Sequence, residues 1–427
     1  MPTSVTTTLF LLASLSLAAF AAPARHVRPA GHAPAPAQPR AIYIITNDQT
    51  NSVVALPVAA DGTLSTGTVT ATGGQGSNSV DGSNQPAAPD ALDAQSSLTL
   101  VGNNIFAVNA GSNTLSMLSF PAQDPTQLTL VGQPVPVSGQ FPNTVAASAK
   151  NKLVCVGTTG AENGVSCSTF SPRGLGQMDA LRSFGLNQTT PPVGPLNTVS
   201  QLFFSEDESR LFATIKGDPA VNNTGFFSVF SVQQAQPQQP HAGNGKGKRK
   251  AKAPCAASLA TQDIRSSPSG TAVLFGSQNI PGTSSSVFVT DASFGAAVLA
   301  VDPATNLASL VGKQAIDGQK ATCWSTISPA TGSAFVTDVL VDRVVEMSLT
   351  DATILSTIDL SSNGDPGMID LAAAGNFIYA LSPGNGTTAP AVTVLDVSGG
   401  QGSAKQIQHF QLDAMGVDKN AVGLVVF

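Results

Sequence analysis

The side chains best suited to chemistry lie close together in a short stretch of the C-terminal half. Residues 318–324 (GQKATCW) place Lys320 four positions before Trp324, the only tryptophan of the chain. A lysine cation beside an indole ring can hold the carboxylate of a small acid or a sugar-like ligand. Asp365 and Asp370 follow near the start of a later predicted strand, where a carboxyl group can carry a proton to or from a bound ligand. We therefore predict Lys320, Asp365 and Asp370 as catalytic residues.

Amide side chains supply a second set of candidates. Asn143, Asn197 and Gln201 stand at or near the predicted starts of strands, where side chains converge on a ligand in many β-proteins. With Trp324, they are the predicted ligand-binding residues. The alternative is that Trp324 fills the centre of the fold while Lys320 is solvated.

Hydrolysis by a Ser-His-Asp triad is poorly supported, because the chain has almost no histidine to act as a base. Of four histidines, only His409 falls in a predicted strand, in the outer part of the last repeat. The other three are His26, His32 and His241. No Gly-x-Ser-x-Gly elbow occurs.

Metal and cofactor motifs are also missing from the sequence. No Cys-x-x-Cys pair is present, so a thiolate metal site is not expected. Residues 206–208 (EDE) fit a solvated turn better than a cation site. The glycines of 243–248 (GNGKGK) follow no predicted strand and lack the Walker pattern. We predict no bound metal and no cofactor.

The elements that must position these side chains form a repeat. Seven stretches each consist of a β-branched, apolar run, a polar turn and a second such run, and their first apolar residues are 44 to 76 positions apart. Phe288-Val289-Thr290-Asp291 even recurs as Phe335-Val336-Thr337-Asp338. The seven stretches are 41–58, 102–120, 151–170, 209–232, 285–302, 332–349 and 375–397.

Six of the hairpins follow a further apolar run rich in small residues, and weaker runs come after them. Four strands per repeat predict an all-β, seven-bladed β-propeller over residues 41–427, with ligands at one mouth of its channel. The first hairpin lacks a preceding run, and residues 421–427 (AVGLVVF) can supply it, which would close the ring and remove exposed sheet edges. The alternative architecture is a pair of β-sandwiches.

The N-terminus indicates secretion. Residues 1–21 contain an apolar run that is too short to span a membrane and end in Ala19-Phe20-Ala21, as a cleaved signal peptide does. Residues 22–40 are rich in Pro and Ala and are expected to be a flexible leader. Three Asn-x-Thr sequons lie in predicted loops, so we predict a glycoprotein that is extracellular or held in a cell wall. The sequon asparagines are Asn187, Asn222 and Asn385.

Four cysteines suit an oxidising compartment. Cys155 and Cys167 lie on the two strands of one predicted hairpin and can face each other. Cys255 and Cys323 are left as the second pair, although four cysteines allow three pairings.

The charge distribution argues against nucleic acid as a partner. The net charge is −6, but eight of the 20 basic residues lie in two acid-free regions, five of them in residues 246–252 (KGKRKAK). Without these eight, 12 basic residues face 26 acidic ones, and such a surface repels nucleic acid and anionic membranes. The stretch 233–254 is predicted to be a disordered loop; the alternatives are a processing site or a polyanion-binding tag.

Three stretches resemble a known family. Residues 107–120 (AVNAGSNTLSMLSF), 318–338 (GQKATCWSTISPATGSAFVTD) and 367–381 (GMIDLAAAGNFIYAL) are similar to lactonase-like seven-bladed propellers. That family includes 6-phosphogluconolactonase and 3-carboxymuconate cyclase, and the likeness is greatest to secreted fungal glycoproteins described as carboxymuconate-cyclase-like. The resemblance spans residues 41–427. Catalytic members are thought to use a channel cluster of His, Arg and Glu, whereas here no histidine falls on an inner strand and Asn143 stands where one is expected.

Two functions follow from the resemblance and the candidate residues. The first is a secreted lactonase or cycloisomerase that acts on a small carboxylated or sugar-lactone ligand. The second is a non-catalytic surface propeller, similar to fungal antigens and adhesins, that binds extracellular matrix or glycans. A monomer is expected in either case.

Overall fold

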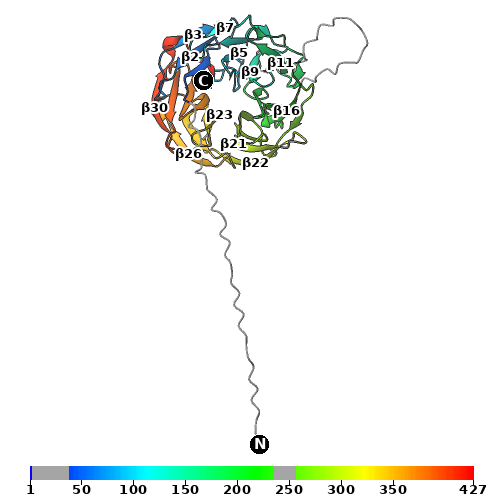
Figure 1. Cartoon of the computed structure of the whole chain (residues 1–427), viewed down its shortest axis with the longest axis vertical. Coiled ribbons are helices and arrows are strands. Elements are labelled where there is room, and N and C mark those ends of the chain that lie inside the picture. Colours follow the sequence, from blue (N-terminus) through cyan, green and yellow to red (C-terminus); the bar gives the residue numbers. More distant parts are fainter. Residues whose placement is uncertain (2–37, 235–255) are drawn as a thin grey trace, which may run out of the picture. The chain divides into compact units, whose positions relative to one another are not determined.

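The computed structural model describes Met1, residues 38–234 and residues 256–427. The predicted signal peptide (1–21), most of the leader and of the basic stretch 233–254, and Cys255 lie outside these described residues. Seven small antiparallel sheets surround a common centre (Figure 1), so the predicted seven-bladed β-propeller is confirmed. We number the sheets as blades 1 to 7 in chain order.

Each blade runs from an inner strand at the channel to an outer strand at the rim. Blade 1 contains β31 (Val422–Val426), β1 (Ala41–Ile45), β2 (Ser52–Pro57) and β3 (Thr68–Ala71). Blade 2 contains β4 (Leu98–Val101), β5 (Asn104–Asn109), β6 (Thr114–Ser119), β7 (Thr129–Leu130) and β8 (Val135–Pro136). Blade 3 contains β9 (Pro142–Ser148), β10 (Leu153–Thr158), β11 (Gly164–Ser171), β12 (Gly174–Leu175) and β13 (Arg182–Ser183).

The remaining blades follow the same plan. Blade 4 contains β14 (Val199–Phe204), β15 (Arg210–Ile215), β16 (Phe226–Gln233), β17 (Ser258–Leu259) and β18 (Ile264–Ser266). Blade 5 contains β19 (Leu274–Asn279), β20 (Ser286–Asp291), β21 (Gly295–Val301) and β22 (Ala308–Ala315). Blade 6 contains β23 (Thr322–Ser328), β24 (Ser333–Asp338), β25 (Val341–Met347) and β26 (Ile354–Asp359). Blade 7 contains β27 (Ile369–Ala374), β28 (Phe377–Ser382), β29 (Ala391–Asp396) and β30 (Lys405–Gln411).

The C-terminal strand closes the ring, as the sequence predicts. β31 pairs with β1 in antiparallel register, with Ile42 opposite Val426. The terminal Phe427 extends the pairing, because its carbonyl accepts from the Arg40 N–H at 2.6 Å and its N–H donates to the Ala41 carbonyl at 2.9 Å. The first and last segments of the propeller thus share one sheet.

Burial explains the strand sequences. A second strand such as β10 (LVCVGT) is buried at every residue, because neighbouring blades cover both faces of its sheet. Such a strand reads as a continuous apolar run. The outer β22 and β26 instead alternate between covered and exposed residues, since one of their faces meets solvent.

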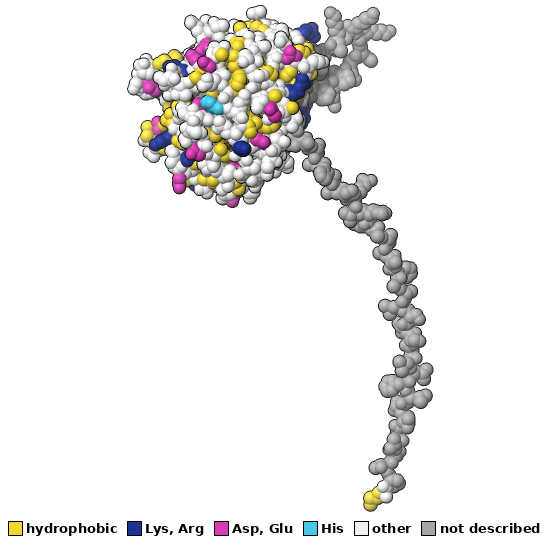
Figure 2. Space-filling model, turned by 90° about the vertical axis from the view of Figure 1, so that its left-hand side faces the viewer, with side chains coloured by type: hydrophobic (Ala, Val, Ile, Leu, Met, Phe, Trp, Pro, Cys, Tyr) yellow, Lys and Arg dark blue, Asp and Glu magenta, His cyan; other side chains and the backbone are white. Residues whose placement is uncertain are grey.

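The described helices are three short 3-10 turns, η1 (Pro219–Val221), η2 (Ser361–Asn363) and η3 (Asp413–Met415), and none has the length or apolarity needed to span a bilayer. Cys155 and Cys167 stand opposite each other on β10 and β11 and form a disulfide. In the face shown in Figure 2, acidic, basic and hydrophobic side chains are interspersed. This face shows no continuous basic surface of the kind that binds a phosphate backbone.

Candidate functional site

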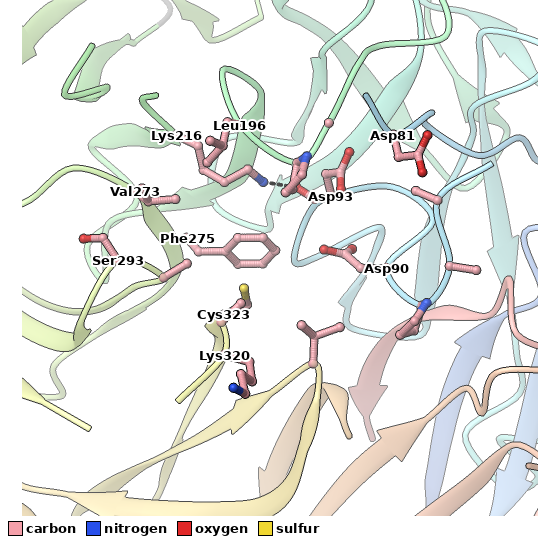
Figure 3. Close-up of a pocket in the computed structure, with 18 of the residues that line it drawn as sticks. Asp81, Asp90, Asp93, Leu196, Lys216, Val273, Phe275, Ser293, Lys320 and Cys323 are labelled. Atoms are coloured by element: carbon pink, nitrogen blue, oxygen red, sulfur yellow. Dashed lines mark hydrogen bonds between the residues drawn. The ribbon is translucent and has the colours of Figure 1, made fainter. Parts of the chain in front are cut away.

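A cavity of about 580 Å³ lies where loops lead into the inner strands of blades 5 and 6 (Figure 3). This size is typical of pockets for small molecules. The walls are mostly apolar, and many of them are Pro and Ala side chains. The polar groups among its lining residues are few and include Asp90, Asp93, Lys216, Lys320 and Cys323.

Two long connections border this cavity. Residues 72–97 link blade 1 to blade 2, and residues 184–198 link blade 3 to blade 4. They are joined to each other, since the Val80 N–H donates to the Pro192 carbonyl at 2.9 Å and the Gly194 N–H donates to the Val80 carbonyl at 2.8 Å. The resulting wall includes Asp90, Asp93 and Gly194.

Residues 90–96, here called the crossing segment, reach across the propeller centre. The N–H of Gln95 donates to the Ser200 carbonyl of blade 4 at 2.9 Å. The Gln95 side chain donates to the Ser325 carbonyl of blade 6 at 2.8 Å and to Asp370 of blade 7 at 3.3 Å. Because it binds several blades, the crossing segment holds fixed the carboxyl groups that it carries.

A bulge recurs in the inner strand of six blades. At each one the register between the first two strands of the blade shifts by one residue. Bulges leave a residue outside the ladder and re-aim its side chain. Two of these residues, Phe275 and Cys323, line the cavity. The residues at the bulges are Asn143, Ser200, Cys323 and Asp370, together with Phe275–Gly276 in blade 5 and Gly423–Leu424 in blade 1.

Lys216 is the buried cation of the site. It follows β15 and is 1% exposed. Its Nζ donates to the Asp93 carbonyl at 2.5 Å and lies 4.2 Å from the centre of the Phe275 ring (Figure 3). Burial lowers the pKa of Lys216, while the nearby Asp93 and Asp90 oppose that shift.

Asp90 and Asp93 bring two carboxyl groups into the same enclosure. Both are buried, both have positive φ (67° and 53°), and each has one carboxyl oxygen without a hydrogen-bond partner. Burial raises the pKa of both groups; for Asp90, the neighbouring Asp93 raises it further. A Cβ at Gly194 would overlap the Asp93 carboxylate, so only glycine leaves room for it there. Burial therefore works against charge on all three groups, the two carboxyl groups and the amine.

The repeated Phe-Val-Thr-Asp motif has a structural role at this mouth. Asp291 accepts hydrogen bonds from the N–H groups of Ala272 at 2.7 Å and Val273 at 3.1 Å. Asp338 does the same one blade later for Lys320 at 2.7 Å. The two aspartates fix the segments that enter the inner strands and so shape two walls of the cavity.

The structure separates the two residues of the 318–324 stretch. Lys320 lines the cavity rim with an exposed side chain. Trp324 is 1% exposed, packs edge-to-face on Phe275 at 5.0 Å and donates from Nε1 to the Ala94 carbonyl at 3.4 Å. This matches the alternative in which Trp324 fills the centre, because the indole supports the crossing segment.

The three amides predicted to bind ligand make contacts within the protein. Asn143 donates to the carbonyls of Leu92 at 3.3 Å and Val199 at 2.6 Å, and Gln201 donates to the Ser96 hydroxyl at 3.0 Å. Asn197 donates to a carbonyl of its own connection, that of Leu186, at 2.7 Å. None of the three is among the residues that line the 580 Å³ cavity. Their predicted role in ligand binding stays a prediction.

Asp365 and Asp370 do not meet Lys320. Asp365 Oδ2 lies 3.0 Å from His409 Nε2 in a hydrogen-bonded ion pair, away from the cavity. Asp370 is buried and accepts from the N–H groups of Leu371 at 2.9 Å and Leu424 at 3.1 Å. The predicted catalytic trio is thus not brought together.

We expect Asp370 to make the fold more stable at pH 5 than at pH 8. Burial raises its folded pKa from 3.8 to about 7, so the stability it contributes is complete below about pH 4 and is lost as pH rises through 7. A shift of this size corresponds to roughly 4 kcal/mol. Urea unfolding at several pH values measures it, and Asp370→Asn is expected to flatten the slope.

Asp342 also contributes to the pH dependence of the free energy of unfolding. Its pKa is also raised to about 7 by burial, so it retains part of the same pH dependence in the Asp370→Asn chain. Equal slopes for the two chains would contradict the assignment to Asp370.

The structure describes Cys323 and the three sequon asparagines, but not Cys255. Cys323 is buried at the cavity wall and has no disulfide partner within the described residues, while Cys255 lies outside them, so their pairing stays a prediction. The sequon asparagines are exposed in loops, where a glycan has room. They are Asn187, Asn222 and Asn385.

Sequence reasoning missed Asp90, Asp93 and Lys216. One signal was present: the first two hairpins begin 63 residues apart, from Ile42 to Ile105, against 44 to 48 in the most regular blades. That excess is the connection that carries both acids.

Comparisons with known proteins bear on the fold. No protein-family model matches the chain, and no curated protein is significantly similar to it in sequence. The periplasmic gluconolactonase PpgL of Pseudomonas aeruginosa is similar in structure, with a TM-score of 0.58, 14% identity, and coverage of 91% of this chain and 99% of that one. A proposed 6-phosphogluconolactonase of Bacteroides fragilis is also similar in structure, with a TM-score of 0.55 and 11% identity. The match covers 91% of this chain and 98% of that one.

A protein of unknown function from Desulfotomaculum acetoxidans is similar over the same share of the chain, with a TM-score of 0.52, 10% identity, and 99% of its own length covered. Identities this low establish the fold alone. The chain is a seven-bladed β-propeller whose architecture is shared with gluconolactonase-type propellers.

Proposed function

We propose that the protein is a lactonase or cycloisomerase that acts on a small lactone or carboxylated ligand in the 580 Å³ cavity. The observation that carries the proposal is an amine, Lys216, enclosed with two carboxyl groups, Asp90 and Asp93, under an apolar wall. Groups with shifted pKa values that share one pocket are typical of proton-transfer sites.

The cavity suits such a ligand. Its apolar walls can cover the body of a small ring, and its few polar groups can bind the carbonyl or carboxylate. Lys320 at the rim is placed to attract a carboxylate. The two gluconolactonase-type neighbours in structure add support, since they share the propeller though not the sequence.

For lactone hydrolysis, the neutral Lys216 amine accepts a proton from water as the water oxygen bonds to the carbonyl carbon. The ring C–O bond breaks, and the ring oxygen takes the proton of the Asp90 carboxyl group. The hydroxy acid leaves, and a proton relayed by water from Lys216 to Asp90 restores both groups. For cycloisomerisation, a carboxylate of the ligand adds to a C=C bond and closes the ring. The neighbouring carbon takes the proton of the Asp90 carboxyl group, and solvent returns a proton to Asp90.

The test is a turnover screen of the purified chain against sugar lactones, aromatic-derived lactones and muconates, followed by NMR. The proposal expects ring opening or closure above the uncatalysed rate with at least one class. No turnover, together with binding of matrix or glycans that Lys320→Ala does not weaken, would instead support the non-catalytic surface propeller.

We also propose that the protein is secreted and is glycosylated at its three sequons. The disulfide of Cys155 and Cys167 supports an oxidising compartment, and all three sequon asparagines are exposed. Treatment of the natively expressed protein with an N-glycosidase is expected to lower its mass. An unchanged mass, with Asn187, Asn222 and Asn385 recovered unmodified, would overturn this part.

A further inference from the structure

Lys216 occupies a position that is apolar in the next two blades. It follows the second strand of blade 4, as Ala292 follows that of blade 5 and Val339 that of blade 6, and all three line the cavity. The repeat therefore does not require a lysine here. A charge-bearing side chain at a buried position of this kind needs an explanation beyond packing.

The surroundings of Nζ do not satisfy an ammonium group. Such a group has three N–H donors, yet the one acceptor recorded for Lys216 in the described part of the chain is the Asp93 carbonyl at 2.5 Å. No carboxylate oxygen in that part lies within 4.0 Å of Nζ. A cation over the Phe275 ring is stabilised by about 2 kcal/mol. This is less than the several kcal/mol that it costs to remove an ion from water.

An uncharged amine is better suited to this environment. It keeps the hydrogen bond to the Asp93 carbonyl and retains a lone pair on nitrogen. The uncharged amine, which a lysine desolvated in an apolar pocket tends to adopt, is the form that attacks carbonyl carbons. The cavity that Lys216 lines has room for a small carbonyl compound.

We propose that Lys216 is a Schiff-base nucleophile for small aldehydes or ketones admitted to the cavity. Its Nζ bonds to the carbonyl carbon while the carbonyl oxygen takes a proton, which gives a carbinolamine after the nitrogen loses one. The C–O bond then breaks, the oxygen leaves as water with a second proton, and a C=N bond remains. One water is released for each imine, and no oxidant or reductant is consumed.

Asp90 is placed to supply the protons. It lines the same cavity, is buried, and has one carboxyl oxygen free of hydrogen bonds. The titratable groups that act on Lys216 are Asp93, Asp90 and Cys323.

Reductive trapping on the full chain tests the proposal. The protein is treated with benzaldehyde and sodium cyanoborohydride at pH 7, and each lysine is scored by peptide mapping. Lys320 is the matched control, because it lines the rim of the same cavity but is exposed. We expect labelling of Lys216 to exceed that of Lys320 severalfold, because burial and a single hydrogen-bond acceptor favour the free amine at Lys216.

The pH profile gives an independent readout. Labelling of Lys216 is expected to level off at a lower pH than labelling of Lys320. Equal labelling of the two lysines, or no label on Lys216, would overturn the proposal. The outcome is separate from lactone turnover, because a chain that opens no lactone can still form the imine.

Discussion

Removing residues 422–427 is expected to abolish the native fold at room temperature. The deletion takes away β31, the inner strand of blade 1, and with it the pairing that joins the two ends of the ring. Val422 and Leu424 are buried, and each such side chain contributes about 1.5–3 kcal/mol. Together with the lost hydrogen bonds between β31 and β1, the lost side-chain burial approaches the free energy of unfolding of a typical domain, which is roughly 5–15 kcal/mol.

Circular dichroism and size-exclusion chromatography measure this effect. Deleting Phe427 alone is the control, since it removes the edge-to-face contact with Phe120 at 4.8 Å but leaves β31 paired. The control is expected to melt cooperatively at a lower temperature. A truncated chain that melts like the full protein would show that closure contributes little.

Asp90→Asn is expected to lower kcat by about 10²- to 10⁴-fold on any lactone that the full protein opens, the usual contribution of a positioned general acid. The amide keeps the shape of the carboxyl group but cannot give up a proton at neutral pH. Because the change is nearly isosteric, KM is expected to move little. Steady-state kinetics of the two chains measure the effect.

Asp351→Asn serves as the control for the kinetic experiment, since this exposed turn residue lies away from the cavity. It is expected to leave kcat and the melting temperature unchanged. If Asp90→Asn retains full kcat in a chain that melts normally, Asp90 is not the proton donor.

The fold was predictable because its information is local. Each hairpin is encoded within about twenty residues, and repetition of Phe-Val-Thr-Asp around Asp291 and Asp338 marks equivalent places in two blades. Closure was predictable as well, since one inner strand was missing and residues 421–427 had no other partner. The short outer pieces of blades 2 to 4 were less clear, because two-residue strands have no period to detect.

The site was not predictable for a related reason. Asp90 and Asp93 lie in a connection that belongs to no repeat, so nothing in the period places them at the channel. Asn143 and Asp370 were predicted near the starts of inner strands, and they lie in β9 and β27. Whether such a side chain faces a ligand or the crossing segment depends on a segment far away in sequence. Lys216 became visible only by comparison with Ala292 and Val339.

The recurring bulges have a consequence for how such a protein can change. The side chain at a bulge stands outside the ladder, so replacing it leaves the strand pairing of its blade intact. Phe275 and Cys323 sit at two of these places and face the cavity. Ligand preference can therefore be altered by single substitutions there without breaking the strand ladder. A small library at these two codons, limited at Phe275 to replacements that keep its packing on Trp324, would explore new specificities.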